Sequence, residues 1–311
     1  MKVLIELPTW LGDAVMATPA IENLENHFDD AKITLIGSSV SIEAIKSHPK
    51  VFKTYILDKT FKNTFKLIKD LGEFDAFFSF RTSLRSKLIK FCISSKSKFQ
   101  FDQKKYTKGH QVEKYNNFIN DSINIDSAPG KLILHNVKQN KLRKNKILGI
   151  NPGSSYGDAK RWYPDEFANV ASALSVDYDI VIFGGPGEKD IAGDIEKNLI
   201  EKGVINYQNL VTHTSISELI SHISSLDLFI TGDSGPMHLA ACFQIPTVSI
   251  FGPTKDNETS QWMNESSFVI KKKLDCQPCM KRRCPLKHHN CMKLIKAKDV
   301  LDVIDSISES Q

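Results

Sequence analysis

The stretch Ile230-Thr-Gly-Asp-Ser-Gly-Pro-Met-His-Leu-Ala-Ala241 follows directly on the apolar run Leu226 to Ile230 and opens a segment with helical character. An apolar strand, a polar turn and a helix in this order form the repeating unit of a parallel α/β sheet. Pro236 suits the first helical turn, Ser234 can cap the free amides, and Gly235 lets a ligand approach the backbone. Because the unpaired N–H groups of such a helix start attract anions, this turn predicts a phosphate site.

A second turn of the same kind lies earlier in this half of the chain. Ile150-Asn-Pro-Gly-Ser-Ser-Tyr-Gly-Asp-Ala-Lys-Arg-Trp-Tyr-Pro164 follows the apolar run Ile147 to Ile150. Ser154 and Ser155 offer hydroxyl donors, and Lys160 adds a mobile cation. The residues do not fit a Walker loop, but they predict a phosphate cradle.

A third turn, Phe183-Gly-Gly-Pro-Gly-Glu188, places a carboxylate where a strand gives way to a helix, and a ribose diol is the natural partner of Glu188. In the first turn discussed, Asp233 would accept hydrogen bonds from hydroxyl groups and His238 would donate one. Capping explains one such turn by itself, but three polar turns after three strands predict a nucleotide at the carboxyl edge of a parallel sheet.

The composition is that of a soluble two-domain protein. The chain has 311 residues, of which 41% are hydrophobic and 25% charged. No signal-peptide pattern opens it, and no apolar run approaches the roughly 20 residues of a membrane span, so we expect a cytoplasmic protein. Its six cysteines are expected to be reduced thiols or metal ligands.

Strands and helices alternate along the whole chain, which predicts two parallel sheets. We expect a first domain over residues 1–143, a second over 144–296, and a terminal amphipathic helix over 297–311. The expected strands of the first domain are Lys2 to Leu7, Lys32 to Gly37, Lys53 to Asp58, Ala76 to Phe80 and Lys98 to Asp102. Those of the second start at Ile147, Tyr178, Asn209, Leu226, Ile245 and Phe268.

Charge is unevenly shared between the halves. Residues 1–145 carry 24 Lys and Arg against 15 Asp and Glu, whereas the remaining residues carry 17 against 21. The segment from Arg81 to Lys108 holds nine basic residues and one acidic residue, Asp102. An anionic partner and a solvated basic face explain this segment equally well on charge alone. We do not expect nucleic acid, because no recognition signature of a nucleic-acid-binding fold accompanies the segment.

The turn after the first strand carries another carboxylate that is a candidate functional residue. Pro8-Thr-Trp-Leu-Gly-Asp-Ala-Val-Met16 puts Asp13 at the carboxyl end of that strand and at the start of a helix. Capping is the ordinary role of such an aspartate. A carboxylate that a helix start keeps ionised can also take a proton from a substrate hydroxyl, which makes Asp13 a candidate general base.

These motifs together resemble one family. The chain is similar to the lipopolysaccharide heptosyltransferases, glycosyltransferase family 9, at Leu11-Gly-Asp-Ala-Val15, Leu84-Arg-Ser86, Gly109-His-Gln-Val-Glu-Lys-Tyr115, Asn151-Pro-Gly-Ser-Ser155, Lys160-Arg-Trp162, Phe183-Gly-Gly185 and Gly232-Asp-Ser-Gly-Pro-Met-His238. The segment Cys276-Gln-Pro-Cys-Met-Lys-Arg-Arg-Cys-Pro-Leu-Lys-His-His-Asn-Cys291 resembles the heptosyltransferase II branch. The matches span nearly the whole chain in the family's order.

The resemblance implies a GT-B architecture, with two Rossmann-like domains facing a central cleft and the final helix packing back toward the first domain. It implies an inverting transfer of heptose from ADP-heptose to the anionic inner core of lipid A. No cofactor or metal is required for this chemistry. The implied place of work is the cytoplasmic surface of the inner membrane, with peripheral contact and no insertion.

Residue roles follow from the resemblance by position. Asp13 is implied as the general base, Lys160 with Ser154 and Ser155 as the diphosphate site, and Glu188 as the ribose ligand. Thr214 is implied near adenine, and Asp233 at the heptose. Ser234, Gly235, Pro236 and His238 are implied to line the diphosphate and sugar. The implied acceptor-binding residues are Arg81, Ser83 and Arg85.

Two alternatives remain open at the level of sequence. One is another GT-B nucleotide-sugar transferase, of heptosyltransferase I or III type. The other is a zinc-dependent binding protein, because Cys276, Cys279, Cys284 and Cys291 have the spacing C-x2-C-x4-C-x6-C with His288 and His289 nearby. The second alternative leaves the three nucleotide-like turns unexplained, so we expect a structural role for the cysteines.

Overall fold

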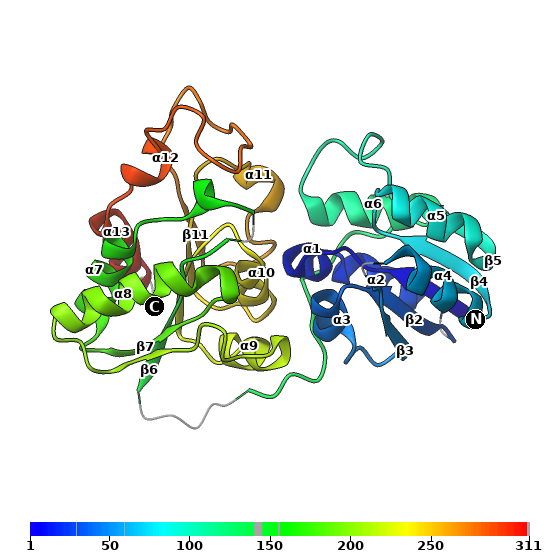
Figure 1. Cartoon of the computed structure of the whole chain (residues 1–311), viewed down its shortest axis with the longest axis horizontal. Helices are drawn as coiled ribbons and strands as arrows, with labels where there is room; N and C mark the ends of the chain where they lie inside the picture. Colours follow the sequence, from blue (N-terminus) through cyan, green and yellow to red (C-terminus); the bar gives the residue numbers. More distant parts are fainter. Residues whose placement is uncertain (29, 59, 140–144, 155, 310–311) are drawn as a thin grey trace. The chain divides into compact units, whose positions relative to one another are not determined.

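The computed structural model describes residues 1–28, 30–58, 60–139, 145–154 and 156–309. The chain divides into two units, Met1–Asn136 and Val137–Gln311, and each is a parallel sheet with helices (Figure 1). The expected α/β class with two parallel-sheet domains is therefore confirmed. No helix among the described residues is long and apolar enough to cross a membrane.

The first unit contains a five-stranded sheet of order β3-β2-β1-β4-β5, in which every pair is parallel. Its strands are β1 (Lys2–Glu6), β2 (Lys32–Gly37), β3 (Val51–Ile56), β4 (Glu73–Ser79) and β5 (Ser94–Gln100). Its helices are α1 (Leu11–Met16), α2 (Thr18–His27), α3 (Ser39–Ile45), α4 (Phe61–Asp70), α5 (Leu84–Cys92) and α6 (Gln111–Ile123). The strand order reverses between β1 and β4, which makes the carboxyl edge there a topological switch point.

Helices cover the first sheet because its central strands are apolar on both faces. Val3, Leu4 and Ile5 of β1 are fully buried. Helices α1, α2, α3 and α6 pack among themselves, and α4 packs against α5. Strands β4 and β5 begin earlier than expected, because Glu73 and the polar, partly exposed residues of edge strand β5 interrupt the apolar pattern.

The second unit contains a six-stranded parallel sheet of order β11-β10-β9-β6-β7-β8. Its strands are β6 (Lys146–Asn151), β7 (Tyr178–Ile182), β8 (Tyr207–Asn209), β9 (Leu228–Gly232), β10 (Thr247–Ile250) and β11 (Ser267–Ile270). Its helices are η1 (Asp158–Lys160), α7 (Pro164–Leu174), η2 (Pro186–Glu188), α8 (Lys189–Glu201), α9 (Ile216–Ile223), α10 (Gly235–Cys242), α11 (Asp256–Thr259), α12 (Asn290–Lys293) and α13 (Ala297–Glu309). Here the order reverses between β9 and β6.

The core of the second unit ties its late helices to its early ones. Trp162 is buried, meets Phe167 edge-on at 4.8 Å between ring centroids, and donates its indole N–H to the Ile295 carbonyl at 2.9 Å. Helix α13 packs against α7, β10 and β11 and buries Val300 and Ile304, so it belongs to this unit. Its expected packing toward the first domain stays a prediction, and the side chain of Ile307, expected on its apolar face, lies outside the described residues.

The boundary between the units falls after Asn136, earlier than the expected position after residue 143. The reason is that the extended segment after α6 is held by the first unit. Leu132 is buried, and the Ile133 N–H donates to Thr18 Oγ1 at 3.1 Å. The apolar periodicity of the sequence weakens over this segment because the described residues of the segment form no helix or strand. The boundary between the two units lies within it.

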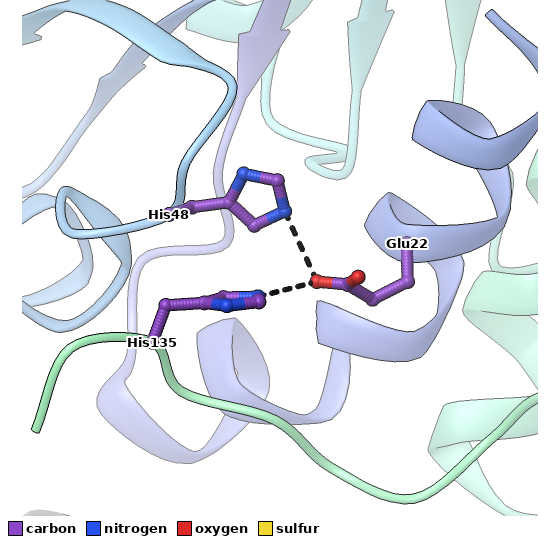
Figure 2. Close-up of side chains that lie close together, drawn as sticks. All are labelled: Glu22, His48 and His135. Atoms are coloured by element: carbon purple, nitrogen blue, oxygen red, sulfur yellow. Dashed lines mark hydrogen bonds and ion pairs between the residues drawn. The ribbon is translucent and has the colours of Figure 1, made fainter. Parts of the chain in front are cut away.

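A histidine and carboxylate cluster completes this attachment (Figure 2). Nε2 of His48 and Nε2 of His135 lie 3.0 and 2.9 Å from Glu22 Oε1, and His48 also pairs with Glu25. Burial would raise the pKa of Glu22, but the hydrogen bonds from the two histidines lower it below its usual value. The Lys50 N–H donates to His48 Nδ1 at 3.2 Å, so the ring proton sits on Nε2. A metal on Nε2 would need that proton on Nδ1, so we interpret the cluster as an attachment of the segment and not as a metal centre.

Candidate active site

Three polar turns meet at the carboxyl edge of the second sheet. Strands β9, β6 and β7 are adjacent and parallel, so the turns that follow them, at residues 232–235, 151–160 and 183–188, lie side by side. Each turn leads into a helical segment, as the sequence predicted. The position beside the β9–β6 reversal is where open parallel sheets bind ligands.

A buried ion pair joins two of these turns. Lys160 Nζ lies 2.5 Å from Asp233 Oδ2 and donates to the Asp233 carbonyl at 3.3 Å. Their side chains are only 12% and 7% exposed. The Thr254 hydroxyl, which follows β10, donates to the same Asp233 oxygen at 2.7 Å. The carboxylate therefore receives donors from two other turns, and the cation is held near the switch point.

An aromatic ring and a distant loop position this lysine. The Tyr156 ring lies 4.6 Å below Lys160 Nζ, and the Tyr156 hydroxyl donates to the Met280 carbonyl at 2.6 Å. The Ala159 N–H donates to the Arg282 carbonyl at 3.1 Å. At Gly157, whose φ is +149°, a Cβ atom would lie 2.5 Å from that same carbonyl oxygen. Only glycine fits there, so the close approach of the two loops fixes the start of the lysine turn.

Ser234 occupies the position before α10, but its hydroxyl makes no side-chain cap to that helix within the described residues. It lies instead 3.0 Å from Thr231 Oγ1 and accepts from Asn151 Nδ2 at 3.3 Å. The expected side-chain cap is therefore wrong. The reason is that Asn151, at the end of β6, draws the hydroxyl toward the neighbouring strand. Gly235 and Pro236 form the first turn of α10, as expected.

The remaining predicted donor residues take varied positions. Ser154 is buried and its Oγ accepts from the Tyr156 N–H at 3.3 Å. Glu188 Oε2 accepts from the Gly185 N–H at 2.8 Å, and its other oxygen lies 3.7 Å from Arg161 Nη2. Their roles toward a ligand stay predictions. The predicted residues not yet placed are His238, buried in α10, Thr214, half-buried just before α9, and Ser155, which lies outside the described residues.

In the first unit, Asp13 occupies the first turn of α1, directly after β1. Its carboxylate lies close enough to Tyr115 of α6 to act on it. Burial and the negative charge of Asp13 hold the pKa of Tyr115 well above its usual value. The side chain of Asp13 is half-buried. This place, in the first turn of a helix beside the β1–β4 reversal, is where open parallel sheets bind ligands, and the role of Asp13 as general base stays a prediction.

The same edge carries a buried carboxylate that sequence reasoning missed. Glu6, the last residue of β1, is fully buried and accepts hydrogen bonds from Ser79 Oγ at 2.6 Å and Ser86 Oγ at 2.9 Å. Arg81 Nη1 lies 3.6 Å away. Burial raises the pKa of Glu6, against the lowering effect of Ser79 and Arg81. A charged residue inside the apolar run of β1 was the signal that could have found it.

Of the three predicted acceptor residues, Arg81 pairs with this carboxylate. Arg81 follows β4, and Ser83 is the N-cap of α5, accepting from the Ser86 N–H at 3.2 Å. Arg85 is directed elsewhere, because it donates to the Asp58 carbonyl and to the Thr64 hydroxyl. Burial, followed by the nearby positive charge of Arg81, lowers the pKa of Arg85. Arg81 is thus the cation that pairs with Glu6 at the switch point. Arg85 instead links α5 to Asp58 and to α4.

Comparison with known proteins identifies relatives of the chain in sequence and in structure. Residues 64–290 match the profile of glycosyltransferase family 9 (heptosyltransferase). The chain is 44% identical over 311 aligned residues to lipooligosaccharide heptosyltransferase 2 of Campylobacter jejuni subsp. jejuni serotype O:2, with 97% of each chain covered. Among solved structures, the E. coli ADP-heptose lps heptosyltransferase II superposes over 100% of both chains with a TM-score of 0.82 at 19% identity. The E. coli heptosyltransferase WaaC with ADP covers 98% of this chain and 99% of its own, with a TM-score of 0.78 at 16% identity.

The solved structures share the fold of two parallel sheets, which confirms the expected GT-B class. The family match covers most of the chain, and the similarity to the Campylobacter enzyme runs over nearly its full length. The resemblance seen in the sequence is thereby confirmed. The chain belongs to glycosyltransferase family 9, the heptosyltransferases, and is a glycosyltransferase.

Proposed function

We propose that this enzyme transfers heptose, with inversion, from ADP-heptose to the heptosyl inner core of lipid A. The observation that carries the proposal is the buried pair of Lys160 and Asp233 at the switch point of the second sheet, with Thr254 as its third member. A cation held at the carboxyl edge, next to the start of α10, suits a nucleoside diphosphate. Relatives named as heptosyltransferases, one of them solved with ADP, support that donor.

In this proposal Lys160 stabilises the diphosphate as it leaves. Negative charge grows on the leaving oxygen during transfer, and a cation already in place lowers the barrier without having to reorganise. Asp233 holds the lysine before the donor binds and offers its carboxylate to heptose hydroxyls afterwards. Ser154, Ser155, Ser234 and the first amides of α10 complete the diphosphate site, with Glu188 at the ribose and Thr214 near adenine. No cofactor takes part in the transfer.

Asp13 is the proposed general base. It takes the proton from the acceptor hydroxyl as that oxygen attacks the anomeric carbon of the donor. A carboxylate is a weak base, and a weak base serves when the proton leaves late in the attack. Arg81, held by Glu6, is the proposed contact for an anionic group of the acceptor, with Ser83 and Arg85 beside it.

We further propose that α5 lies on the cytoplasmic surface of an anionic membrane, where the acceptor resides. Leu84, Leu88 and Phe91 of this helix are 78%, 42% and 82% exposed and follow the spacing i, i+4, i+7 of one helical face. Lys87 and Lys90 lie on the same helix. Apolar side chains with flanking lysines suit peripheral binding to anionic lipid. Because Ser83 caps this helix, such docking would bring lipid-borne acceptor to the Arg81 turn.

The test of the transfer reaction is turnover with defined acceptors. Purified enzyme is given ADP-heptose with lipid A acceptors that carry zero, one or two core heptoses, and products are identified by mass. We expect transfer to the acceptor with one heptose. A preference for the heptose-free acceptor would make it a first-heptose enzyme. A panel of other nucleotide sugars that served equally well would overturn the donor assignment.

The membrane contact is tested with vesicles. Sedimentation with anionic phosphatidylglycerol vesicles should exceed that with neutral phosphatidylcholine vesicles. The double variant Leu84→Ser/Phe91→Ser should lose most of this binding while its turnover on a detergent-solubilised acceptor is kept. Val176→Ser/Ile205→Ser removes two side chains that are 90% and 91% exposed in the second unit, and it should bind as the parent does. Equal loss in both variants would refute a specific role for α5.

A further inference from the structure

Lys160 and its neighbour Arg161 extend toward different turns of the second sheet. The chain leaves the helical turn η1 at Arg161, where φ is −81° and ψ is 126°, and the two side chains diverge. Lys160 reaches Asp233 in the turn after β9, whereas Arg161 Nη2 donates to the Gly187 carbonyl at 2.8 Å in the turn after β7. Since β6 lies between β9 and β7, these two residues connect the turn after β6 to the turns on both sides of it.

The guanidinium of Arg161 lies beside the carboxylate of Glu188. Arg161 Nη2 is 3.7 Å from Glu188 Oε1, and the other oxygen, Oε2, accepts from the Gly185 N–H at 2.8 Å. The Glu188 side chain is only 11% exposed. One oxygen is therefore fixed by a backbone amide and the other faces a cation. Because a carboxylate oxygen can accept two hydrogen bonds, both oxygens keep capacity for further donors.

The turn after β6 makes room for this carboxylate by having no side chain at residue 153. A Cβ atom added at Gly153 would lie 1.8 Å from Glu188 Cγ, 2.5 Å from Cδ and 2.7 Å from Oε1. Non-bonded atoms do not come this close, so any other residue at position 153 would displace the Glu188 side chain. Gly153 directly precedes Ser154 of the proposed diphosphate site. The carboxylate thus lies against the backbone of the proposed phosphate turn.

The contacts of Arg161 are poorly suited to stabilising the fold. Its distance to Glu188 is long for an ion pair, and its other carboxylate neighbour, Asp158 at 3.5 Å, is 65% exposed. Arg161 Nε is buried and has no hydrogen-bond partner among the described residues. A buried N–H group without a partner costs free energy, and an exposed ion pair offsets little of that cost. A role in orienting the carboxylate explains this arrangement better than a role in stability.

We propose that Arg161 and Gly153 are positioning residues that fix the Glu188 carboxylate for the 2′- and 3′-hydroxyls of the nucleotide's ribose. The inference rests on the proposed place of Glu188 at the ribose and adds the residues that make this place selective. A carboxylate already held in one orientation can accept from both hydroxyls of a cis diol with little loss of conformational freedom on binding. A deoxyribose offers one hydrogen bond fewer, so the site should discriminate against it.

Nucleotide discrimination is the first test, because a purely structural role would not change it. Calorimetry compares the affinities of ADP and 2′-deoxy-ADP for the full-length protein. The parent should prefer ADP by about tenfold or more, the scale of one hydrogen bond to a charged group. Arg161→Ala should lose most of this preference, with a melting temperature close to that of the parent. Arg283→Ala, at an exposed arginine of the cysteine segment (residues 276–291), is the matched control and should keep the preference.

Substitution of the glycine provides the second test. Gly153→Ala should lose the preference for ADP as fully as Glu188→Ala does. The Glu188 atoms that a Cβ at residue 153 would meet lie beyond the Cβ of Glu188, so Gly153→Ala/Glu188→Ala removes the clash. This double variant should bind ADP as Glu188→Ala alone does, even if Gly153→Ala by itself folds poorly. Gly193→Ala on α8 is the matched control, because an added Cβ there would meet no described atom outside its own helix within 4 Å.

The outcomes distinguish this inference from the proposed reaction. A parent that does not bind ADP overturns both. A parent that transfers heptose from ADP-heptose but binds ADP and 2′-deoxy-ADP equally well overturns the selective ribose site and leaves the reaction standing. If the parent prefers ADP and Arg161→Ala keeps the full preference, the positioning role of Arg161 is refuted. A further loss of ADP affinity on adding Gly153→Ala to Glu188→Ala would refute the role of Gly153.

Discussion

Each sheet places a buried carboxylate beside the reversal of its strand order, but the two carboxylates have different surroundings. In the first unit, Glu6 ends β1, receives two serine hydroxyls and has its arginine 3.6 Å away. In the second unit, Asp233 follows β9, receives one threonine hydroxyl and has its lysine 2.5 Å away. The first carboxylate lies inside the strand, whereas the second lies in the turn.

This difference separates two tasks that a buried charge can perform. The carboxylate of Glu6 has its hydrogen-bond partners within the protein, and we propose that it holds Arg81 in place for an anionic acceptor. Asp233 lies in the turn just before α10. A diphosphate bound at this helix start can therefore replace Asp233 as the ion-pair partner of Lys160. A buried pair contributes little net stability, which favours roles in positioning over roles in holding the fold.

The sharpest test of the first site is Asp13→Asn, which keeps the shape and removes the basicity. Transfer should fall by roughly 10³-fold or more, the upper range for loss of a general base. ADP affinity, measured by calorimetry on the same preparation, should stay close to that of the parent. A variant that turned over at nearly the parent rate would reduce Asp13 to a helix cap.

In the second site, Lys160→Ala should lower turnover by roughly a hundredfold, the scale of losing one preorganised charge at a leaving group. Lys197→Ala removes an exposed lysine of α8 in the same unit and should leave turnover unchanged. The comparison between the two sheets breaks if Lys160→Ala only raises the donor KM, because Lys160 would then contribute to ground-state binding alone.

Glu6→Gln tests whether the first carboxylate positions Arg81. The acceptor KM should rise about tenfold with kcat kept, the equivalent of about 1.4 kcal/mol of binding. Since the folded pKa of Glu6 is raised by burial, its ionisation costs stability as pH rises through that pKa. At neutral pH, the free energy of unfolding of the variant should therefore equal or exceed that of the parent. A large loss of stability would show Glu6 to be mainly structural.

The smallest effect is expected at the attachment of the extended segment. Glu22→Gln should lower the free energy of unfolding by about 1–2 kcal/mol at neutral pH, because it removes a charged acceptor from two histidines. The folded pKa of Glu22 is lowered from 4.5, so this stability is present above about pH 4.5 and is lost as the pH falls through the folded pKa. The difference between variant and parent should shrink in that acid range. Glu201→Gln, at a side chain of α8 that is 61% exposed, is the control.

Sequence reasoning located the three turns and the strands before them because apolar runs that end in glycine, serine or aspartate are local signals. It paired Lys160 with phosphate chemistry, but it did not foresee that Asp233 would hold the lysine, since that contact depends on the strand order β9-β6. Thr254 and Glu6 were missed for the same reason. A hydroxyl after β10 and a carboxylate in β1 acquire meaning only when neighbouring strands bring their partners.

The hydrogen bond from the Ala159 N–H to the Arg282 carbonyl joins two segments that the ribosome synthesises at different times. A ribosome delivers β6 to β9 long before the cysteine segment, so the central strands can pair while the lysine turn still lacks its support. The close contact between Gly157 and the Arg282 backbone can form only after Arg282 has left the ribosome. The Lys160 turn of the nascent enzyme would thus lack this support until Arg282 has been translated, which delays the organisation of the proposed donor site.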